Sequence, residues 1–196
     1  MNLANKLTLL RVILVPVFLI FLIGKGIPYG SIIATLIFII ASLTDQLDGY
    51  IARSRNQITN FGKFMDPLAD KLLVTAALIS LVELHLIPSW AAVIIIAREF
   101  AVSGLRTVAA SEGTVIAASW WGKIKTVTQI IAILLLLLQV NIESIQSLNS
   151  SIEASAFLNN FFAYAPKIAL FIAVAMTIIS GIDYFIKNKG AISSNK

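Results

Sequence analysis

Four aspartates lie within one short stretch of the sequence, between two long apolar runs. Asp45 and Asp48 are three residues apart, and Asp66 and Asp70 are four residues apart. On a helix, residues at these spacings share a face, so two facing helix ends would bring four carboxylates together. Like charges in a poorly solvated place repel each other, and divalent cations would hold them ionised. The stretch therefore predicts a metal site, and its hard oxygen ligands favour Mg²⁺ or Mn²⁺.

Small residues and an arginine are interleaved with these acids. Gly49 and Ala52 leave room for a ligand close to the backbone, and Arg53 offers the planar fork that binds phosphate. Asp66 and Pro67 predict a helix start, with the aspartate as cap and the proline at the first helical position. A single aspartate could merely cap a helix or pair with a nearby cation. Four at paired helical spacings favour a site for a metal-bound diphosphate, in which two metals clamp the phosphoryl oxygens.

The composition indicates an integral membrane protein. The 196 residues are 58% hydrophobic and only 13% charged, with a mean hydropathy of +0.90, which is too apolar for a soluble domain to cover its surface. The formal net charge of +5 indicates cytoplasmic loops and anionic lipid head groups. We therefore expect membrane lipids, and no nucleic acid, as partners. The chain has no cysteine, which excludes disulfides and thiolate metal sites.

Six apolar runs are long enough to cross about 30 Å of hydrocarbon. We predict spans at Leu7–Ile23, Ser31–Ile51, Pro67–Leu86, Ser89–Ala110, Trp120–Val140 and Ala163–Ile186. Because the backbone in a bilayer must satisfy its own hydrogen bonds, these spans are predicted to be helices, and the fold class is an all-α polytopic membrane protein. No soluble domain or internal repeat interrupts them, so residues 1–196 are predicted to form one domain. The segment Asn141–Asn160, rich in Asn and Ser, is expected to separate the fifth and sixth spans.

The basic residues fall mostly on one side of this six-span arrangement. By the positive-inside rule, they place both termini and the loop of the acid cluster in the cytoplasm. Asp45 follows Ser31 by fourteen residues, or about 21 Å of helix, which leaves it inside the membrane toward the cytoplasmic face. Ionisable residues at that depth are costly and are functional candidates.

A second group of charged residues is cationic. Arg98 lies about 13 Å into its predicted helix, near the middle of the membrane, where an arginine should face a polar cavity or an acid. Arg106 follows two turns later, and Lys123 and Lys125 open the fifth span. Together they suggest an anion pocket for an acceptor that carries phosphate. Two alternatives stay open: Arg98 could pair with Glu99 or another acid, and the two lysines could simply set the topology.

The stretch from Asp45 to Asp70 resembles, without a gap, the signature of the CDP-alcohol phosphotransferase family, D-x2-D-G-x2-A-R-x8-G-x3-D-x3-D. Members are membrane enzymes that move a phosphoryl-linked group from a CDP-linked donor to an alcohol and release CMP. The resemblance implies metal ligation by four residues, Asp45, Asp48, Asp66 and Asp70. It also implies that Asp70 acts as the general base. The CDP site would be shaped by Asp48, Gly49, Ala52, Arg53 and Gly62.

Further residues resemble the phosphatidylglycerophosphate synthase branch of this family. They are Arg98-Glu-Phe-Ala-Val-Ser-Gly104-Leu-Arg106, Gly122-Lys123-Ile-Lys125-Thr126 and the opening Asn5-Lys-Leu-Thr8-Leu-Leu-Arg11. The resemblance extends from about Asn2 to Gln139. It implies CDP-diacylglycerol and sn-glycerol 3-phosphate as substrates, a homodimer, and a multi-pass protein of the plasma membrane whose active site faces the cytoplasm. Neither the resemblance nor the spacing assigns a role to Asn5, Thr8 and Arg11.

Two other functions remain open at this point. Within the family, the acceptor could be inositol phosphate, serine or phosphatidylglycerol. In another class of protein, the acids could line a divalent-cation transporter, but a transporter would usually show repeat symmetry and acids deeper in several spans. Metal-dependent CMP release would favour the enzyme, and metal uptake into vesicles without CMP release would favour the transporter.

Overall fold

The computed structural model is helical wherever the chain forms regular structure within the described residues. It describes residues 3–24, 26–54, 60–111, 113, 116–117, 119–148 and 156–188. Within the helices, the side chains at positions 3–5, 45–54, 60–64, 66–67, 70, 147–148, 156 and 159 lie outside the description. For the described residues, the all-α prediction is confirmed.

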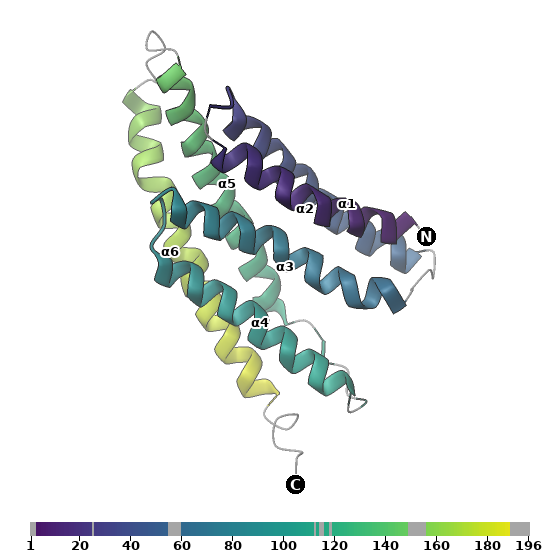
Figure 1. Ribbon diagram of the computed structural model, residues 1–196. Helices are drawn as coiled ribbons and strands as arrows, with labels where there is room; N and C mark the ends of the chain where they lie inside the picture. Colours follow the sequence, from purple (N-terminus) through teal and green to yellow (C-terminus); the bar gives the residue numbers. More distant parts are fainter. Residues whose placement is uncertain are drawn as a thin grey trace. The chain divides into compact units, whose positions relative to one another are not determined.

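Six helices make up the described part of the chain (Figure 1). They are α1 (Leu3–Ile23), α2 (Gly30–Ser54), α3 (Asn60–Glu83), α4 (Ser89–Ser111), α5 (Trp120–Leu148) and α6 (Ala156–Lys187). Five contain one of the six apolar runs identified in the sequence, and α3 contains all but the last three residues of the run Pro67–Leu86. The prediction of where helices occur is therefore confirmed, and the differences lie at their ends.

The start of α3 differs from the prediction. The helix begins at Asn60, so the prediction that Asp66 caps it and that Pro67 takes its first position is wrong. Asparagine also favours helix starts, and a proline inside a membrane helix is tolerated when nearby groups re-satisfy the freed carbonyl. Because the helix dipole acts mainly within the first turn, it gives Asp66 less support than a capping position would.

The segment between the fifth and sixth helices is also shorter than expected. The segment Asn141–Asn160 was predicted to lie between helices, but α5 continues to Leu148 and α6 already begins at Ala156. Asn and Ser have only modestly unfavourable helix propensities, and tertiary packing overrides them here: Asn141 is buried and bonded to α2. Residues 149–155 lie outside the described part.

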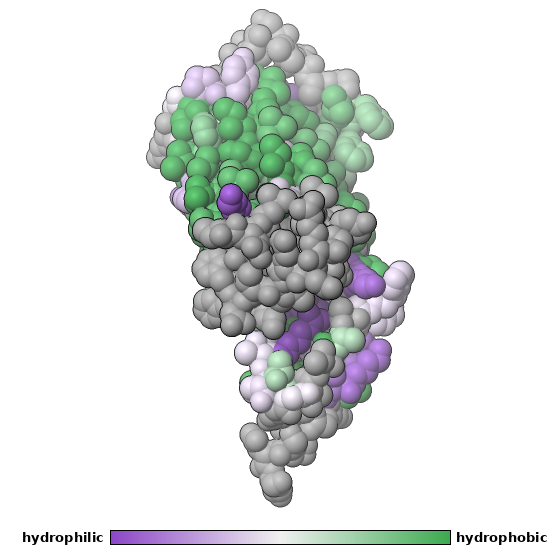
Figure 2. Space-filling model, turned by 90° about the vertical axis from the view of Figure 1, so that its right-hand side faces the viewer, coloured by the Kyte–Doolittle hydropathy of each residue, from purple (hydrophilic) through white to green (hydrophobic). Residues whose placement is uncertain are grey.

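Several helices have the length and apolarity of membrane spans. Among the described residues, three meet both criteria over a full span, at Lys6–Ile23, Trp120–Gln146 and Asn160–Lys187, and Gly30–Thr44 is a shorter apolar helical stretch. Large apolar side chains are exposed on these helices, and Figure 2 shows a broad hydrophobic area on the surface. Such exposure is expected of a protein whose surface faces lipid. Membrane character is thus supported, while the full six-span topology stays a prediction.

The chain divides into two compact units, which we describe separately. The first comprises Met1–Ile87 and Leu137–Ser155, and the second comprises Pro88–Leu136 and Ala156–Lys196. The long helix α5 contributes to both units.

In the first unit, α1 packs against α2 and α3. The buried residues of α1 recur every three or four positions, as expected for one face of a helix: Thr8, Arg11, Val15, Phe18 and Leu22. Phe18 contacts Phe38 of α2, with ring centroids 6.0 Å apart. The short connection between α1 and α2 makes the pair antiparallel, so this contact fixes which parts of the two helices lie at the same level.

In the second unit, α4 packs against α6. The buried face of α4 consists of apolar residues, Ala91, Ala92, Ile95, Val102 and Ala109. The buried face of α6 is apolar around its middle, at Leu170, Ala173 and Val174, and becomes polar toward its end, at Thr177, Ser180 and Tyr184. This polar end of α6 bonds to two arginines of α4, Arg98 and Arg106.

Candidate functional site

The eight signature residues themselves all lie in helical backbone. The aspartates Asp45 and Asp48 lie in the C-terminal part of α2, and Asp66 and Asp70 lie in the N-terminal half of α3. Gly49, Ala52 and Arg53 belong to the same part of α2, and Gly62 to the first turn of α3. The side chains of all eight signature residues lie outside the description, so their grouping around a metal stays a prediction.

The donor chemistry of these two helices fits a divalent metal. Both acid pairs keep helical spacing, because α2 is helical through Asp45 and Asp48 and α3 through Asp66 and Asp70. Each pair therefore shares one face of its helix. Both helices belong to the same compact unit and follow each other directly in the chain. Carboxylate oxygens in that number are the ligands that Mg²⁺ and Mn²⁺ prefer.

Helix α1 carries a buried cation that we expect to lie level with the first signature aspartate. Arg11 is only 1% exposed and lies on the stripe that contains Phe18. Phe18 of α1 contacts Phe38 of α2. Arg11 lies seven residues before Phe18, and Asp45 lies seven residues after Phe38 on the antiparallel neighbour. Because helices rise equally per residue, we expect Arg11 to lie level with Asp45. The sequence left Arg11 unassigned, although its place between apolar residues was a signal.

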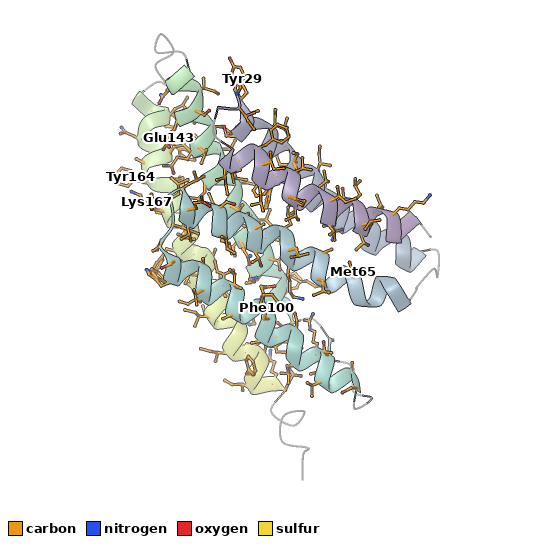
Figure 3. The ribbon with its side chains drawn as sticks, viewed as in Figure 1. Tyr29, Met65, Phe100, Glu143, Tyr164 and Lys167 are labelled. Carbon is orange, nitrogen blue, oxygen red and sulfur yellow. The ribbon has the colours of Figure 1, made fainter. Side chains whose placement is uncertain are left out.

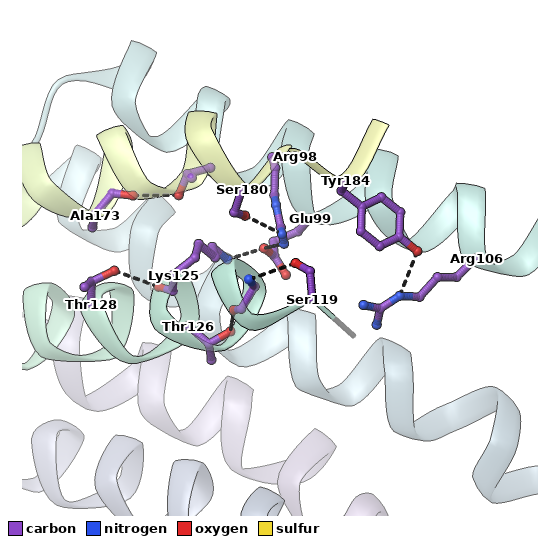
Figure 4. A network of polar contacts seen from close by, with 12 residues as sticks. Arg98, Glu99, Arg106, Ser119, Lys125, Thr126, Thr128, Ala173, Ser180 and Tyr184 are labelled. Carbon is purple, nitrogen blue, oxygen red and sulfur yellow. Dashed lines mark hydrogen bonds and ion pairs between the residues drawn. The ribbon is translucent and has the colours of Figure 1, made fainter. Parts of the chain in front are cut away.

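In the second unit, two of the predicted acceptor-binding cations meet at one carboxylate (Figure 4). Glu99 Oε1 accepts a hydrogen bond from Arg98 Nη1 at 3.1 Å and also forms an ion pair with Lys125 Nζ. The side chains of Lys125 and Arg98 are 2% and 13% exposed. The pairing of Arg98 with Glu99, considered as an alternative from the sequence, is therefore observed. Among the described residues, this one carboxylate therefore contacts two cations, Arg98 and Lys125.

Arg98 is also held by α6. Its Nη2 donates a hydrogen bond of 2.6 Å to Ser180 Oγ. Two glycines lie beside it: a Cβ on Gly181 would come within 3.3 Å of Arg98 Cγ, and one on Gly122 would lie 3.7 Å from Arg98 Nη2. The stem of Arg98 thus passes close to α6 because position 181 has no side chain. Arg98 Nε is buried with no hydrogen-bond partner among the described residues.

The other two predicted cations lie on aromatic rings. Arg106 Nε donates a hydrogen bond of 3.1 Å to the Tyr184 hydroxyl, and its guanidinium carbon lies 5.4 Å from the centre of that ring. Lys123 Nζ lies 5.5 Å from the Trp120 ring centre. Both distances are typical of cation–π contacts. Arg106 and Lys123 are exposed, so both remain open to a ligand.

Sequence reasoning missed the α6 residues that hold these arginines. The available signal was a row of polar residues in a mostly apolar helix, Thr177, Ser180 and Tyr184, at spacings of three and four residues. All three are at most 1% exposed. Polar side chains on the buried face of a membrane helix need partners, and here Arg98 and Arg106 are the partners of Ser180 and Tyr184.

Comparison with known proteins adds to this geometry. Residues 1–179 match the family described as CDP-alcohol phosphatidyltransferase. A Bacillus subtilis protein named CDP-diacylglycerol–glycerol-3-phosphate 3-phosphatidyltransferase is 46% identical over 205 residues, which cover 99% of this chain and 98% of that protein. A Haemophilus influenzae protein of the same name is 41% identical over 201 residues, which cover 99% of this chain and 97% of that protein.

Proposed function

The chain belongs to the CDP-alcohol phosphatidyltransferase family of membrane enzymes, and on that premise we propose that it transfers a phosphatidyl group from CDP-diacylglycerol to sn-glycerol 3-phosphate. The products are phosphatidylglycerophosphate and CMP. Relatives that match nearly the full length carry this activity in their names. The observation that carries the choice of acceptor is the convergence of Arg98 and Lys125 on one carboxylate, because cations held close together suit a substrate with a phosphate group.

The CDP-linked donor is assigned to the signature residues. Asp45, Asp48, Asp66 and Asp70 would hold two divalent ions, Mg²⁺ or Mn²⁺, which when bound neutralise the diphosphate and stabilise the leaving CMP. The remaining signature residues, Gly49, Ala52, Arg53 and Gly62, together with Asp48, would shape the CDP site. Glycine and alanine allow close approach to the helix backbone, and the arginine fork matches phosphate oxygens.

The acceptor is assigned to the cations of the second unit. Arg98, Arg106, Lys123 and Lys125 would bind the phosphate of glycerol 3-phosphate. Glu99 balances part of their charge before the acceptor arrives, which lowers the cost of keeping Arg98 and Lys125 buried and charged. Serine carries no phosphate and would not need this group of cations, and phosphatidylglycerol carries only a diester.

The reaction is a substitution at the phosphorus that bears the diacylglycerol. Asp70, directly or through water, accepts the proton from the primary hydroxyl of glycerol 3-phosphate. The oxygen forms its bond to phosphorus as the bond from phosphorus to the CMP oxygen breaks, and CMP leaves with that electron pair. Positioning and charge neutralisation account for most of the rate in transfers of this kind.

The membrane arrangement is part of the same proposal. One domain of six spans would place both termini and the active site on the cytoplasmic side of the plasma membrane, with the protein as a homodimer. The excess of basic residues on one side of the spans supports this orientation.

The decisive experiment measures CMP release by the purified enzyme in detergent or vesicles. CDP-diacylglycerol is supplied with glycerol 3-phosphate, inositol phosphate, serine or phosphatidylglycerol, in the presence of Mg²⁺, Mn²⁺ or a chelator. We expect metal-dependent release only with glycerol 3-phosphate. Equal or faster release with another alcohol would show that glycerol 3-phosphate is not the preferred acceptor. Metal uptake into vesicles without CMP release would show that the protein is a transporter and not this enzyme.

A further inference from the structure

The end of α6 presents a polar face to the arginines of the second unit. Ser180 and Tyr184 are one turn apart and therefore lie on the same side of the helix, and Gly181 lies next to them. Ser180 is 0% exposed and Tyr184 1% exposed. Each contacts a different arginine of α4, so two contacts tie the two helices together (Figure 4).

Tyr184 holds Arg106 in two ways at once. Its hydroxyl accepts the hydrogen bond from Nε, and its ring lies beneath the guanidinium. Because Nε is the bonded nitrogen, the bond to Tyr184 leaves the two terminal nitrogens to turn toward a ligand. A free arginine samples many rotamers, and fixing it before the ligand arrives removes that entropy cost from binding.

Ser180 acts on Arg98 in a similar way. The hydroxyl accepts from Nη2 while Glu99 accepts from Nη1, so both terminal nitrogens are oriented. Gly181 allows the stem of Arg98 to pass at this distance, since a Cβ there would lie within 3.3 Å of Arg98 Cγ. The planar guanidinium is thereby set in one orientation by side chains of α4 and α6.

We propose that Ser180 and Tyr184 are positioning residues for the acceptor: they hold Arg98 and Arg106 in the orientation that binds the acceptor's phosphate. This inference rests on the proposed function, because it concerns the same phosphate site. It adds α6 to that site, whereas the sequence patterns assign the acceptor to residues of α4 and α5 alone. It also predicts that removing one hydroxyl weakens acceptor binding without touching the donor.

The test compares Tyr184→Phe with Tyr164→Phe. The first removes the hydroxyl and keeps the ring under Arg106. The second makes the same chemical change on the same helix at a side chain that is 68% exposed and points away from the helices (Figure 3). Steady-state kinetics are measured for each substrate separately, with thermal unfolding as a check on folding. A Ser180→Ala variant provides an independent second test.

For Tyr184→Phe we expect the KM for glycerol 3-phosphate to rise about five- to tenfold, the size of effect typical of one lost hydrogen bond. The KM for CDP-diacylglycerol and kcat should stay within about twofold of wild type, because the substitution changes no contact to the donor. Tyr164→Phe should behave as wild type. In an Arg106→Ala background, Tyr184→Phe should have no further effect, because Tyr184 acts through Arg106.

Three outcomes would overturn the inference. An unchanged KM for glycerol 3-phosphate in Tyr184→Phe, an equal rise in both KM values, or an additive effect in the Arg106→Ala background would each show that Tyr184 is only structural. These results differ from a failure of the proposed function. If wild-type CMP release is indifferent to glycerol 3-phosphate, both proposals fail; if it depends on glycerol 3-phosphate and on Arg106 but not on Tyr184 or Ser180, only this one fails.

Discussion

The two candidate sites differ in how far apart in the sequence their parts lie. The acid signature is contained in Asp45–Asp70, on two consecutive helices. The cation cluster takes side chains from α4, α5 and α6, and its partners are as far apart as Arg98 and Ser180, 82 positions. A site that is local in sequence can be proposed from residue spacing alone. A site assembled from distant helices shows its charges in the sequence, but the sequence does not show which neutral residues orient them.

The largest expected effect concerns the local site. Asp48→Asn keeps the size of the side chain but removes a charge that would ligate metal, so we expect turnover to fall by at least about a hundredfold. CMP release under saturating substrate and Mg²⁺ measures this loss. The matched control is Asp183→Asn, the same change at an acid that forms an ion pair with Lys187 at 2.7 Å on α6. It should retain near-normal turnover.

A folded Asp48→Asn enzyme with wild-type turnover would contradict the prediction that the signature acids bind the metal. Folding is checked by circular dichroism and by elution as a single species. If both asparagine variants lost activity equally, the comparison between a signature acid and an acid outside the signature would fail.

The next largest effect concerns the assembled site. Arg98→Ala removes the guanidinium held by Glu99 and Ser180, so we expect the KM for glycerol 3-phosphate to rise about ten- to a hundredfold. The KM for CDP-diacylglycerol should change little. Lys167→Ala is the control, because Lys167 is an exposed cation on α6 that points away from the helices (Figure 3). Equal rises in both KM values for Arg98→Ala would place Arg98 outside the acceptor site.

A smaller effect tests whether Arg11 of α1, distant in sequence, contributes to the acid site of α2 and α3. Arg11 is buried on α1 at the level expected for Asp45, where its charge would offset the repulsion between carboxylates when metal is absent. We therefore expect Arg11→Met to lower the unfolding temperature by on the order of 5 °C in a chelator, and by clearly less with Mg²⁺ present, since the metal takes over the role of counter-ion.

Lys6→Met provides the control for Arg11→Met. Lys6 lies on the same helix and is exposed, so its loss should leave the unfolding temperature nearly unchanged with or without metal. If Arg11→Met were equally destabilising in both conditions, Arg11 would be a packing residue with no relation to the acids.

Sequence reasoning succeeded where the physical cause is local. Apolar run length placed all six helices, because a bilayer leaves little alternative to helix for long apolar segments. It misplaced the start of α3 because Asp66 and Pro67 look like a cap whenever the preceding residues are ignored. It also missed Ser180 and Tyr184, since their partners are set by how α6 packs on α4, and no spacing within α6 encodes that packing.

The first unit contains a polar contact far from the signature end of α2. Asn141 Nδ2 of α5 donates a hydrogen bond of 3.0 Å to Thr35 Oγ1, and Thr35 in turn bonds the Ser31 carbonyl of its own helix at 2.8 Å. Both Thr35 and Asn141 are buried. This contact joins α2 to the part of α5, just past Val140, that the sequence predicted to separate the fifth and sixth spans.

The smallest expected effect follows from that contact. Thr35→Val keeps the shape of the side chain and removes the hydroxyl, so we expect a loss of roughly 0.6 kcal/mol in unfolding free energy, the average for hydrogen bonds between membrane helices, with both KM values unchanged. Thr107→Val is the control: Thr107 makes the same bond to its own helix, to the Ser103 carbonyl at 3.0 Å, but is exposed. If the two variants lost equal stability, the bond to Asn141 would contribute nothing. If Thr35→Val raised either KM, the Thr35–Asn141 contact would belong to a substrate site and would not be a purely structural contact of this unit.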